Sequence, residues 1–111
     1  MFTRTDAAPF RLLAPGVEMR TLCHGQRTLT TEFRLTTGHE LPSHSHPHEQ
    51  TGYLVSGRIM LRIGDEVHEA TPGSSWTIGS SIEHGATIVE DSVTMEVFSP
   101  LREDLLAPEP A

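Results

Sequence analysis

The sequence predicts an all-β fold, a small sandwich or barrel in a single domain. From Gly16 onward, short runs of alternating apolar and polar residues are separated by turn residues such as Gly, Pro and Ser. Hardly any segment has the period of an amphipathic helix. The 111 residues fit one compact domain and leave little room for a second.

The expected strands follow one another at short, regular intervals. They are the alternating runs 17–23, 27–35, two strands within 52–64 that meet at Ser56-Gly57, then 66–70, 75–78, 86–90 and 92–98. Gly64-Asp65 is expected to form the turn before 66–70. Asp91-Ser92 is expected to form a hairpin turn between the last two strands.

The two ends of the chain fall outside this pattern. Residues 1–15 are expected to form an arm that packs on the barrel or on a neighbouring subunit. Ser99-Pro100 can open a short helix through Leu106, with Ser as N-cap and Pro at the first helical position. The domain is therefore assigned to 16–106, and the tail 107–111 is expected to be disordered.

Composition disfavours several functional classes. Eight basic and fifteen acidic residues give a net charge of −7, which argues against nucleic acid and anionic membranes as partners. All basic residues are Arg, so this chain offers no Schiff-base lysine. A single cysteine, Cys23, excludes an intrachain disulfide and fits a reducing compartment. Without an apolar signal region or membrane-length apolar window, a cytoplasmic protein is expected.

The segment HSHPHEQ, residues 44–50, has the composition of a metal site. On an extended strand, one face would carry His44, His46, His48 and Gln50. Imidazole together with amide or carboxylate oxygen suits a divalent ion such as Zn, Fe, Ni or Mn. A mononuclear site needs a further ligand from elsewhere, and His84, which follows an apolar strand and a Gly/Ser-rich corner, is the candidate.

Two neighbours of these histidines leave alternatives open. Pro47 can twist the strand and turn His48 away, which makes His48 a pocket residue or a proton carrier. If the register slips by one residue, Glu49 replaces Gln50 as the third ligand.

The spacing of these residues resembles the first motif of the cupin family. That motif is Gly, five residues, HxH, three or four residues, Glu, six residues and Gly. The chain has Gly38, His44-Ser45-His46, Gln50 and Gly57 at these spacings, with Gln in place of Glu. In the second cupin motif, the first Gly and the His match Gly73 and His84. The Pro, Gly and Asn of that motif are replaced by Gly79, Ser81 and Ile88.

The resemblance implies a small antiparallel β-barrel, also called a jelly roll or double-stranded β-helix. It further implies one bound divalent metal ion, whose ligands would be His44, His46, Gln50 and His84. Gln in place of Glu removes one negative charge from the site, so the metal should be more electrophilic.

The ending FSPLRED, residues 98–104, resembles the single-domain cupins of the pectin-degradation group, which convert unsaturated uronates to linear keto sugars. In those relatives an acidic residue, a phenylalanine and an arginine line the pocket, which implies roles for Glu96, Phe98 and Arg102. The acidic residue is Asp in those relatives, and a pocket glutamine is replaced here by Gly52. Tyr53, beside it, is a further candidate for substrate binding.

The residues themselves support two readings of this ending. Arg102 presents a planar fork suited to a substrate carboxylate, or it forms an ordinary ion pair with an acid such as Glu103 or Asp104. Glu96 points away from the face of its two apolar strand neighbours, so it faces solvent or enters the barrel as a general acid or base. The only tryptophan, Trp76, is favoured as a core residue over a substrate platform.

The function predicted from these features is that of a metal-binding cupin enzyme. It would act on a small anionic carbonyl or sugar-derived substrate by Lewis-acid-assisted proton transfer, as a lyase or isomerase. An Fe-dependent dioxygenase and a non-catalytic metal- or ligand-binding module are the alternatives. A homodimer is expected because a small barrel must cover exposed strand edges.

Overall fold

The computed structural model describes residues 1–106, and strands dominate this part of the chain. The expected tail, 107–111, lies outside the described residues. The elements are β1 (Arg11–Ala14), β2 (Val17–His24), β3 (Leu29–Leu35), β4 (Glu40–His44), β5 (Glu49–Ile63), β6 (Glu66–Ala70), β7 (Ser75–Ile78), β8 (His84–Ser99) and the 3-10 turn η1 (Glu103–Leu105).

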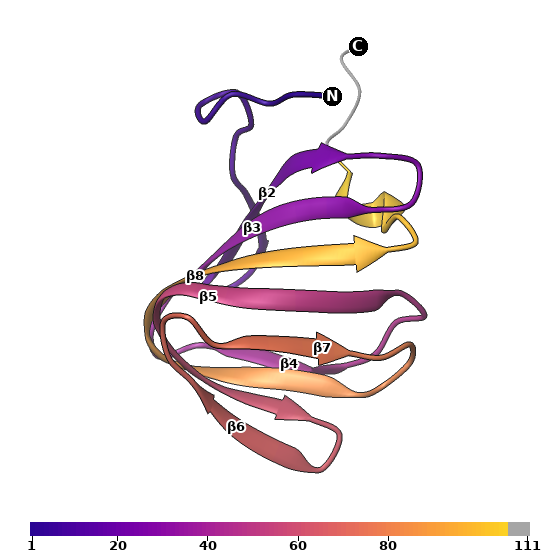
Figure 1. The fold of residues 1–111 in the computed structure, drawn as a ribbon. Coiled ribbons are helices and arrows are strands. Elements are labelled where there is room, and N and C mark those ends of the chain that lie inside the picture. Colours follow the sequence, from indigo (N-terminus) through magenta and orange to yellow (C-terminus); the bar gives the residue numbers. More distant parts are fainter. Residues whose placement is uncertain (107–111) are drawn as a thin grey trace.

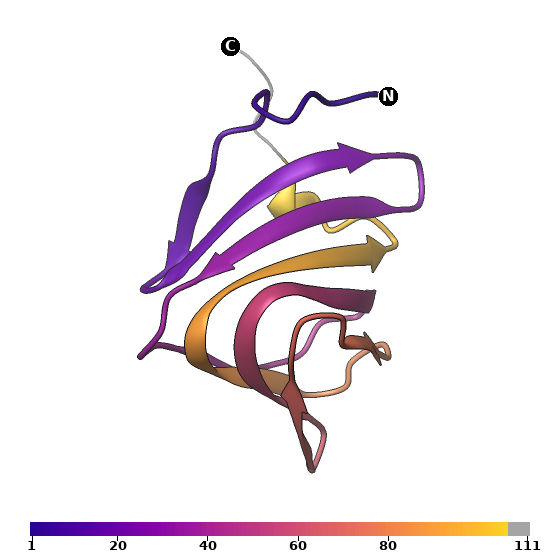
Figure 2. The ribbon, with the colours of Figure 1, turned by 60° about the vertical axis from the view of Figure 1, so that its left-hand side comes forward.

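The two longest strands, β5 and β8, pair antiparallel along almost their whole length, and the other strands extend this ladder. The first half of β5 and the second half of β8 form a sheet with β7, β3, β2 and β1. The other halves form a sheet with β6 and β4. Figures 1 and 2 show both long strands curling round, so that the sheets face each other. The predicted antiparallel β-barrel is confirmed.

Both long strands bend at the same place, where Gly57 of β5 meets Asp91 and Ser92 of β8. The pairing register shifts three times between Leu54 and Ile59. Gly57 has φ +95°, and a Cβ atom there would overlap the Ser92 hydroxyl and the Asp91 carbonyl oxygen. The Ser92 hydroxyl also accepts a hydrogen bond of 3.0 Å from the backbone of Arg58. A side chain at position 57 is therefore excluded by both conformation and space.

The predicted hairpin turn at Asp91-Ser92 is wrong, because both residues lie inside β8. The predicted break at Ser56-Gly57 is likewise a bend within the single strand β5. A sharp bend needs the same small, turn-compatible residues as a chain reversal. Only the pairing of the two strands across the bend distinguishes these cases.

Strand alternation decides which residues of β8 face the barrel interior. Ser92, Thr94, Glu96 and Phe98 are buried. Met95 and Val97 point the other way, so Glu96 enters the barrel, which was one of the two orientations left open. Two apolar clusters form the core. The larger contains Val17, Leu35, Leu54, Ile59, Leu61, Ala70, Ala86 and Ile88, and the smaller contains Met19, Leu29, Phe98 and Leu105.

The expected C-terminal helix is reduced to the single turn η1, whose N-cap is Arg102 rather than Ser99. Ser99 pairs with Glu49 as the last residue of β8, so ladder pairing replaces the expected N-cap role. At the other end, residues 11–14 of the expected arm form β1, which pairs with β2. Within residues 1–106, no helix has the length and apolar character needed to cross a membrane.

We expect Gly57→Ala to lower the free energy of unfolding by at least about 2 kcal/mol, because it adds a backbone clash to an unfavourable φ. Urea denaturation followed by circular dichroism measures this loss. Gly64→Ala is the matched control, since Gly64 also has positive φ (+58°) but has open space around its Cβ position. Equal losses in the two variants would show that the contact with β8 does not matter.

Candidate metal centre and adjoining cavity

Three histidines gather where the end of β4 meets the start of β8. His44 pairs directly with His84 across these strands, and His46 follows in the segment between β4 and β5. The ring centroid of His84 lies 4.3 Å from that of His44 and 5.0 Å from that of His46. One ligand atom from each residue lies within 4.8 Å of the others. The structure thus brings three of the four predicted ligands into one cluster.

Each of these imidazoles is oriented by a backbone carbonyl. The Nδ1 atoms of His44, His46 and His84 lie 3.0, 3.0 and 2.8 Å from the carbonyl oxygens of residues 42, 48 and 82. An Nδ1–H that donates to a carbonyl leaves the Nε2 lone pair free for a metal ion. The Nε2 atom of His84 is buried and has no hydrogen-bond partner. Because no protein group forms a hydrogen bond with this nitrogen, its free lone pair suits a metal ligand.

The fourth predicted ligand, Gln50, lies beside the cluster. Its Oε1 is 3.1 Å from Nε2 of His46, and its Nε2 donates a hydrogen bond of 3.0 Å to Oε2 of Glu96. The second bond fixes the orientation of the amide, so its oxygen faces His46. With the His46 proton on Nδ1, two acceptor atoms face each other, an arrangement that a cation between them would stabilise.

The surroundings of His46 and His84 favour their neutral forms, which are the forms that bind a metal ion. Burial lowers the pKa of His46, and the charge of Arg102 lowers it further. Burial also lowers the pKa of His84. The donor set of three imidazoles and one amide oxygen fits a divalent ion of the Zn, Fe, Ni or Mn type.

A cavity of about 170 Å³ adjoins this cluster inside the barrel. Most of its lining is apolar. The polar residues among the lining are His44, Gln50, His84, Thr94, Glu96 and Arg102. Two of the predicted substrate-binding residues, Phe98 and Arg102, therefore lie at the cavity, and the predicted proton carrier Glu96 does as well.

Burial raises the pKa of Glu96 to about 8, against the opposing effect of the hydrogen bond from Gln50. The side chain is only 7% exposed. A carboxyl group with this pKa can hold or release a proton near neutral pH.

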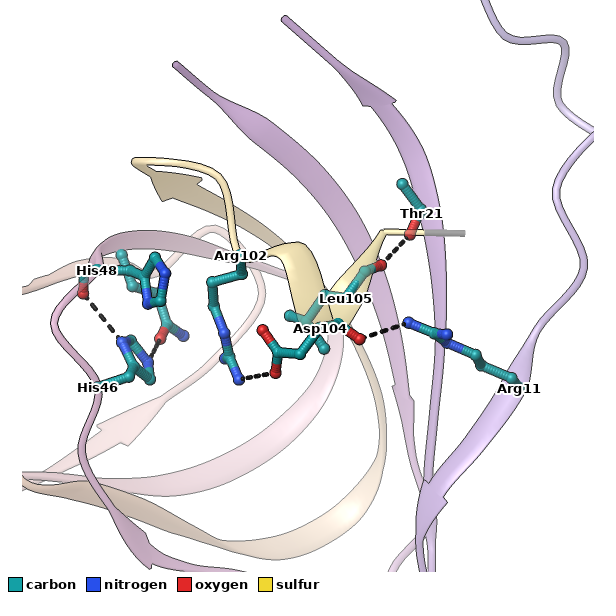
Figure 3. A network of polar contacts seen from close by, with 8 residues as sticks. Arg11, Thr21, His46, His48, Arg102, Asp104 and Leu105 are labelled. Atoms are coloured by element: carbon teal, nitrogen blue, oxygen red, sulfur yellow. Dashed lines mark hydrogen bonds and ion pairs between the residues drawn. The ribbon is translucent and has the colours of Figure 1, made fainter. Parts of the chain in front are cut away.

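Arg102 forms the ion pair that was one of the two roles left open by the sequence, and it also lines the cavity. Its guanidinium lies 4.9 Å over the Phe98 ring, and its Nη2 forms an ion pair of 2.8 Å with Asp104. Figure 3 shows the guanidinium between this carboxylate and the side chains of His46 and His48. Although partial burial acts in the opposite direction, the Arg102 partner lowers the pKa of Asp104. The Nε atom of Arg102 is buried and unpartnered, so its N–H can donate to a ligand.

The turn that carries Arg102 is held by the other end of the chain (Figure 3). Arg11 of β1 donates a hydrogen bond of 3.2 Å to the carbonyl oxygen of Asp104, and the Thr21 hydroxyl donates to the carbonyl oxygen of Leu105. The sequence analysis missed these contacts, because nothing in the local pattern links residues 11 and 104.

Three other predicted residues lie outside the cavity lining. His48 stacks near His46, with ring centroids 5.6 Å apart, and its carbonyl oxygen contacts the Nδ1 of that residue. Glu49 is exposed at the start of β5, whereas Gln50 is buried toward the site. Tyr53 is 48% exposed and alternates with buried Leu54, which places it on the outer face of β5.

Trp76 packs against the larger core cluster, as predicted, and also lines the cavity. Gly52 pairs with both Trp76 and Glu96, and a Cβ atom at position 52 would overlap Nε1 of the former and Oε2 of the latter. The sequence showed only that a glycine replaces a glutamine here. Its consequence, an indole beside the buried carboxyl, depends on strand pairing.

A family model described as "Cupin domain" matches residues 31–100. The chain belongs to the cupin family. This assignment confirms the resemblance that the HxH segment indicated. No curated protein sequence matches this cupin.

Solved structures extend the likeness over nearly the whole cupin. KdgF from Halomonas sp. is 26% identical, with a TM-score of 0.90, and the match covers 96% of this chain and 98% of that chain. An RmlC-like cupin from Shewanella frigidimarina is 23% identical, with a TM-score of 0.90 and 95% of each chain covered. The polyketide cyclase RemF from Streptomyces resistomycificus is 24% identical, with a TM-score of 0.74 and coverage of 90% and 78%. The last two show the fold alone.

We expect the stability of the metal-free protein to fall between pH 4.5 and about 8 through Glu96. In this window the unfolded state releases the Glu96 proton, while the folded state retains it because its pKa is raised from 4.5 to about 8. Glu96→Gln removes this dependence, so its stability relative to wild type should rise with pH. Urea denaturation in EDTA at pH 5 and pH 8.5 measures the difference.

The control is Glu18→Gln, a substitution of an exposed glutamate on β2. Its effect on stability should be the same at both pH values. A Glu96→Gln effect that is equally independent of pH would contradict the buried, protonated state of this carboxyl.

Proposed function

We propose that this cupin is a metal-dependent enzyme that moves a proton on a small anionic carbonyl substrate, as a lyase or isomerase. The observation that carries the proposal is the cluster of three oriented imidazoles beside a cavity that also contains a buried carboxyl and an arginine. The likeness to KdgF at 26% identity, together with the resemblance of the chain end to the pectin-degradation cupins, supports a carbonyl or sugar-derived acid as substrate.

In this proposal His44, His46 and His84 hold the metal ion, with Gln50 as the fourth ligand. Bound there, the ion would supply Lewis-acid polarisation of a carbonyl oxygen. The ligands carry no negative charge, because Gln50 replaces the glutamate of the family motif. A neutral ligand set leaves the full charge of the ion available to the substrate.

The other residues divide binding and proton transfer. The unpartnered Nε of Arg102 donates to a substrate carboxylate, and the guanidinium packs against the face of the Phe98 ring. Glu96 lines the cavity and moves the proton, positioned by the hydrogen bond from Gln50. His48 is the second candidate for the proton carrier, since its Nδ1 is buried without a partner.

We expect purified protein to contain one divalent metal ion per chain, and His46→Ala or His84→Ala to lose most of it. Each variant removes one of the imidazoles that surround the site. Elemental analysis by mass spectrometry measures the stoichiometry. His68→Ala is the matched control, because this exposed histidine lies on β6, is hydrogen-bonded to Glu66 and is not part of the histidine cluster. Full metal content in the His46→Ala and His84→Ala variants would refute the metal centre.

The same samples test the proton transfer. Deuterium incorporation from D₂O at the carbon next to the carbonyl, followed by NMR on small 2-oxo acids and uronates, should require metal. Glu96→Gln should lower its rate by about 100-fold or more. Oxygen consumption with Fe(II) and no deuterium incorporation would favour a dioxygenase. Stoichiometric metal with neither reaction would favour a binding module.

We also propose that the protein is a homodimer that pairs through β1. This strand is at the end of the sheet order, and its Leu12 side chain is 69% exposed. Apolar edge strands favour pairing with a second chain, whereas the edge strand β6 carries charged residues that oppose it.

Light scattering coupled to size-exclusion chromatography should show a dimer for the wild type and a monomer for Leu12→Lys. Val67→Lys, at a 61% exposed apolar position on β6, is the control and should remain dimeric. A monomeric wild type at micromolar concentration would contradict the proposal.

A further inference from the structure

The cavity beside the candidate metal centre is apolar over most of its wall. Apolar side chains from several strands close it, among them Leu35 of β3, Ile59 and Leu61 of β5, Ile78 of β7 and Ala86 of β8. Its volume is about 170 Å³. An apolar cavity of roughly 150 Å³ holds a benzene molecule, so this one holds a hydrocarbon group of similar size.

The polar groups of the wall are largely occupied by one another. The Gln50 amide donates a hydrogen bond to Glu96, and its oxygen faces Nε2 of His46. Three buried nitrogens of lining residues remain without a hydrogen-bond partner, namely Nε1 of Trp76, Nε2 of His84 and Nε of Arg102. Free polar recognition is therefore confined to the candidate metal site, one guanidinium and one indole N–H.

The pairing at Gly52 removes another place for a polar contact. A side chain there would overlap Trp76 and Glu96, so the glutamine that the pectin-degradation cupins use at this position has no room. The indole of Trp76 occupies this part of the wall instead. The substitution replaces an amide, which both donates and accepts hydrogen bonds, by an indole ring with a single N–H donor.

We infer that the site selects a small carbonyl acid with a hydrocarbon tail over a polyhydroxylated sugar acid. This inference rests on the proposed function and specifies its substrate class. The carboxylate and carbonyl oxygens face Arg102 and the metal site, and the tail enters the apolar cavity. Sugar hydroxyls would lose their hydrogen bonds to water and find few free donors or acceptors in the wall. The binding of a hydrocarbon tail is instead favoured by the burial of its apolar surface.

Binding of straight-chain 2-oxo acids, from pyruvate to 2-oxohexanoate, tests the inference on wild-type protein as purified. Isothermal titration calorimetry should show affinity rising about fourfold for each added CH₂, the factor that corresponds to ~0.8 kcal/mol. 2-Oxohexanoate should bind at least tenfold more tightly than D-galacturonate. Tighter binding of D-galacturonate, or an affinity that does not change with chain length, would overturn the inference.

Two variants and one further measurement separate this inference from the proposed function. Arg102→Gln should weaken all 2-oxo acids by one common factor and preserve the increment for each CH₂. Arg58→Gln, an arginine paired with Glu69 away from the cavity, should leave all affinities unchanged. After EDTA treatment the increment should persist at lower affinity, and its disappearance would overturn the inference. If only the proposed function is wrong, the purified protein will contain no metal and will still show this increment for each CH₂.

Discussion

The pairing of β5 with β8, bent at Gly57, is the constraint on which the rest of the structure depends. Below the bend this ladder sets Gly52 opposite Glu96 and Gln50 opposite Phe98. Beyond it, the same ladder sets Ile63 opposite His84, and β4 then brings His44 to His84. Because the two strands bend at the same place, residues from both halves of each strand line one cavity.

The chemistry of the site follows from how its side chains are held. Backbone carbonyls orient all three imidazoles, so the tautomer suited to metal binding needs no additional acidic residue. Gln50 has one amide atom toward His46 and the other toward Glu96. The replacement of glutamate by glutamine therefore changes two groups together, because it leaves the ligand set neutral and supplies a donor to a buried carboxyl.

Much of this arrangement could be predicted from local patterns. Alternation identified the strands and placed Glu96 on the face opposite Met95 and Val97, since side chains on a strand change face at every residue, but it left open which face is the interior. The spacing of the histidines and Gly57 identified the family, which the matching family model confirms. Errors occurred at Asp91-Ser92 and Ser99-Pro100, where local turn and helix preferences were overridden by pairing with β5. Propensity acts over a few residues, whereas ladder pairing joins residues far apart in the chain.

The sequence by itself determined the all-β class, the set of candidate metal ligands and the absence of lysine chemistry, because these depend on residue type and short spacing. The tertiary structure alone decided that Tyr53 faces outward, that Trp76 occupies the space left by Gly52, and that Arg102 is held by a turn tied to β1. These outcomes depend on which distant strands lie side by side. That arrangement follows from the folding of the β5–β8 ladder, which no local pattern encodes.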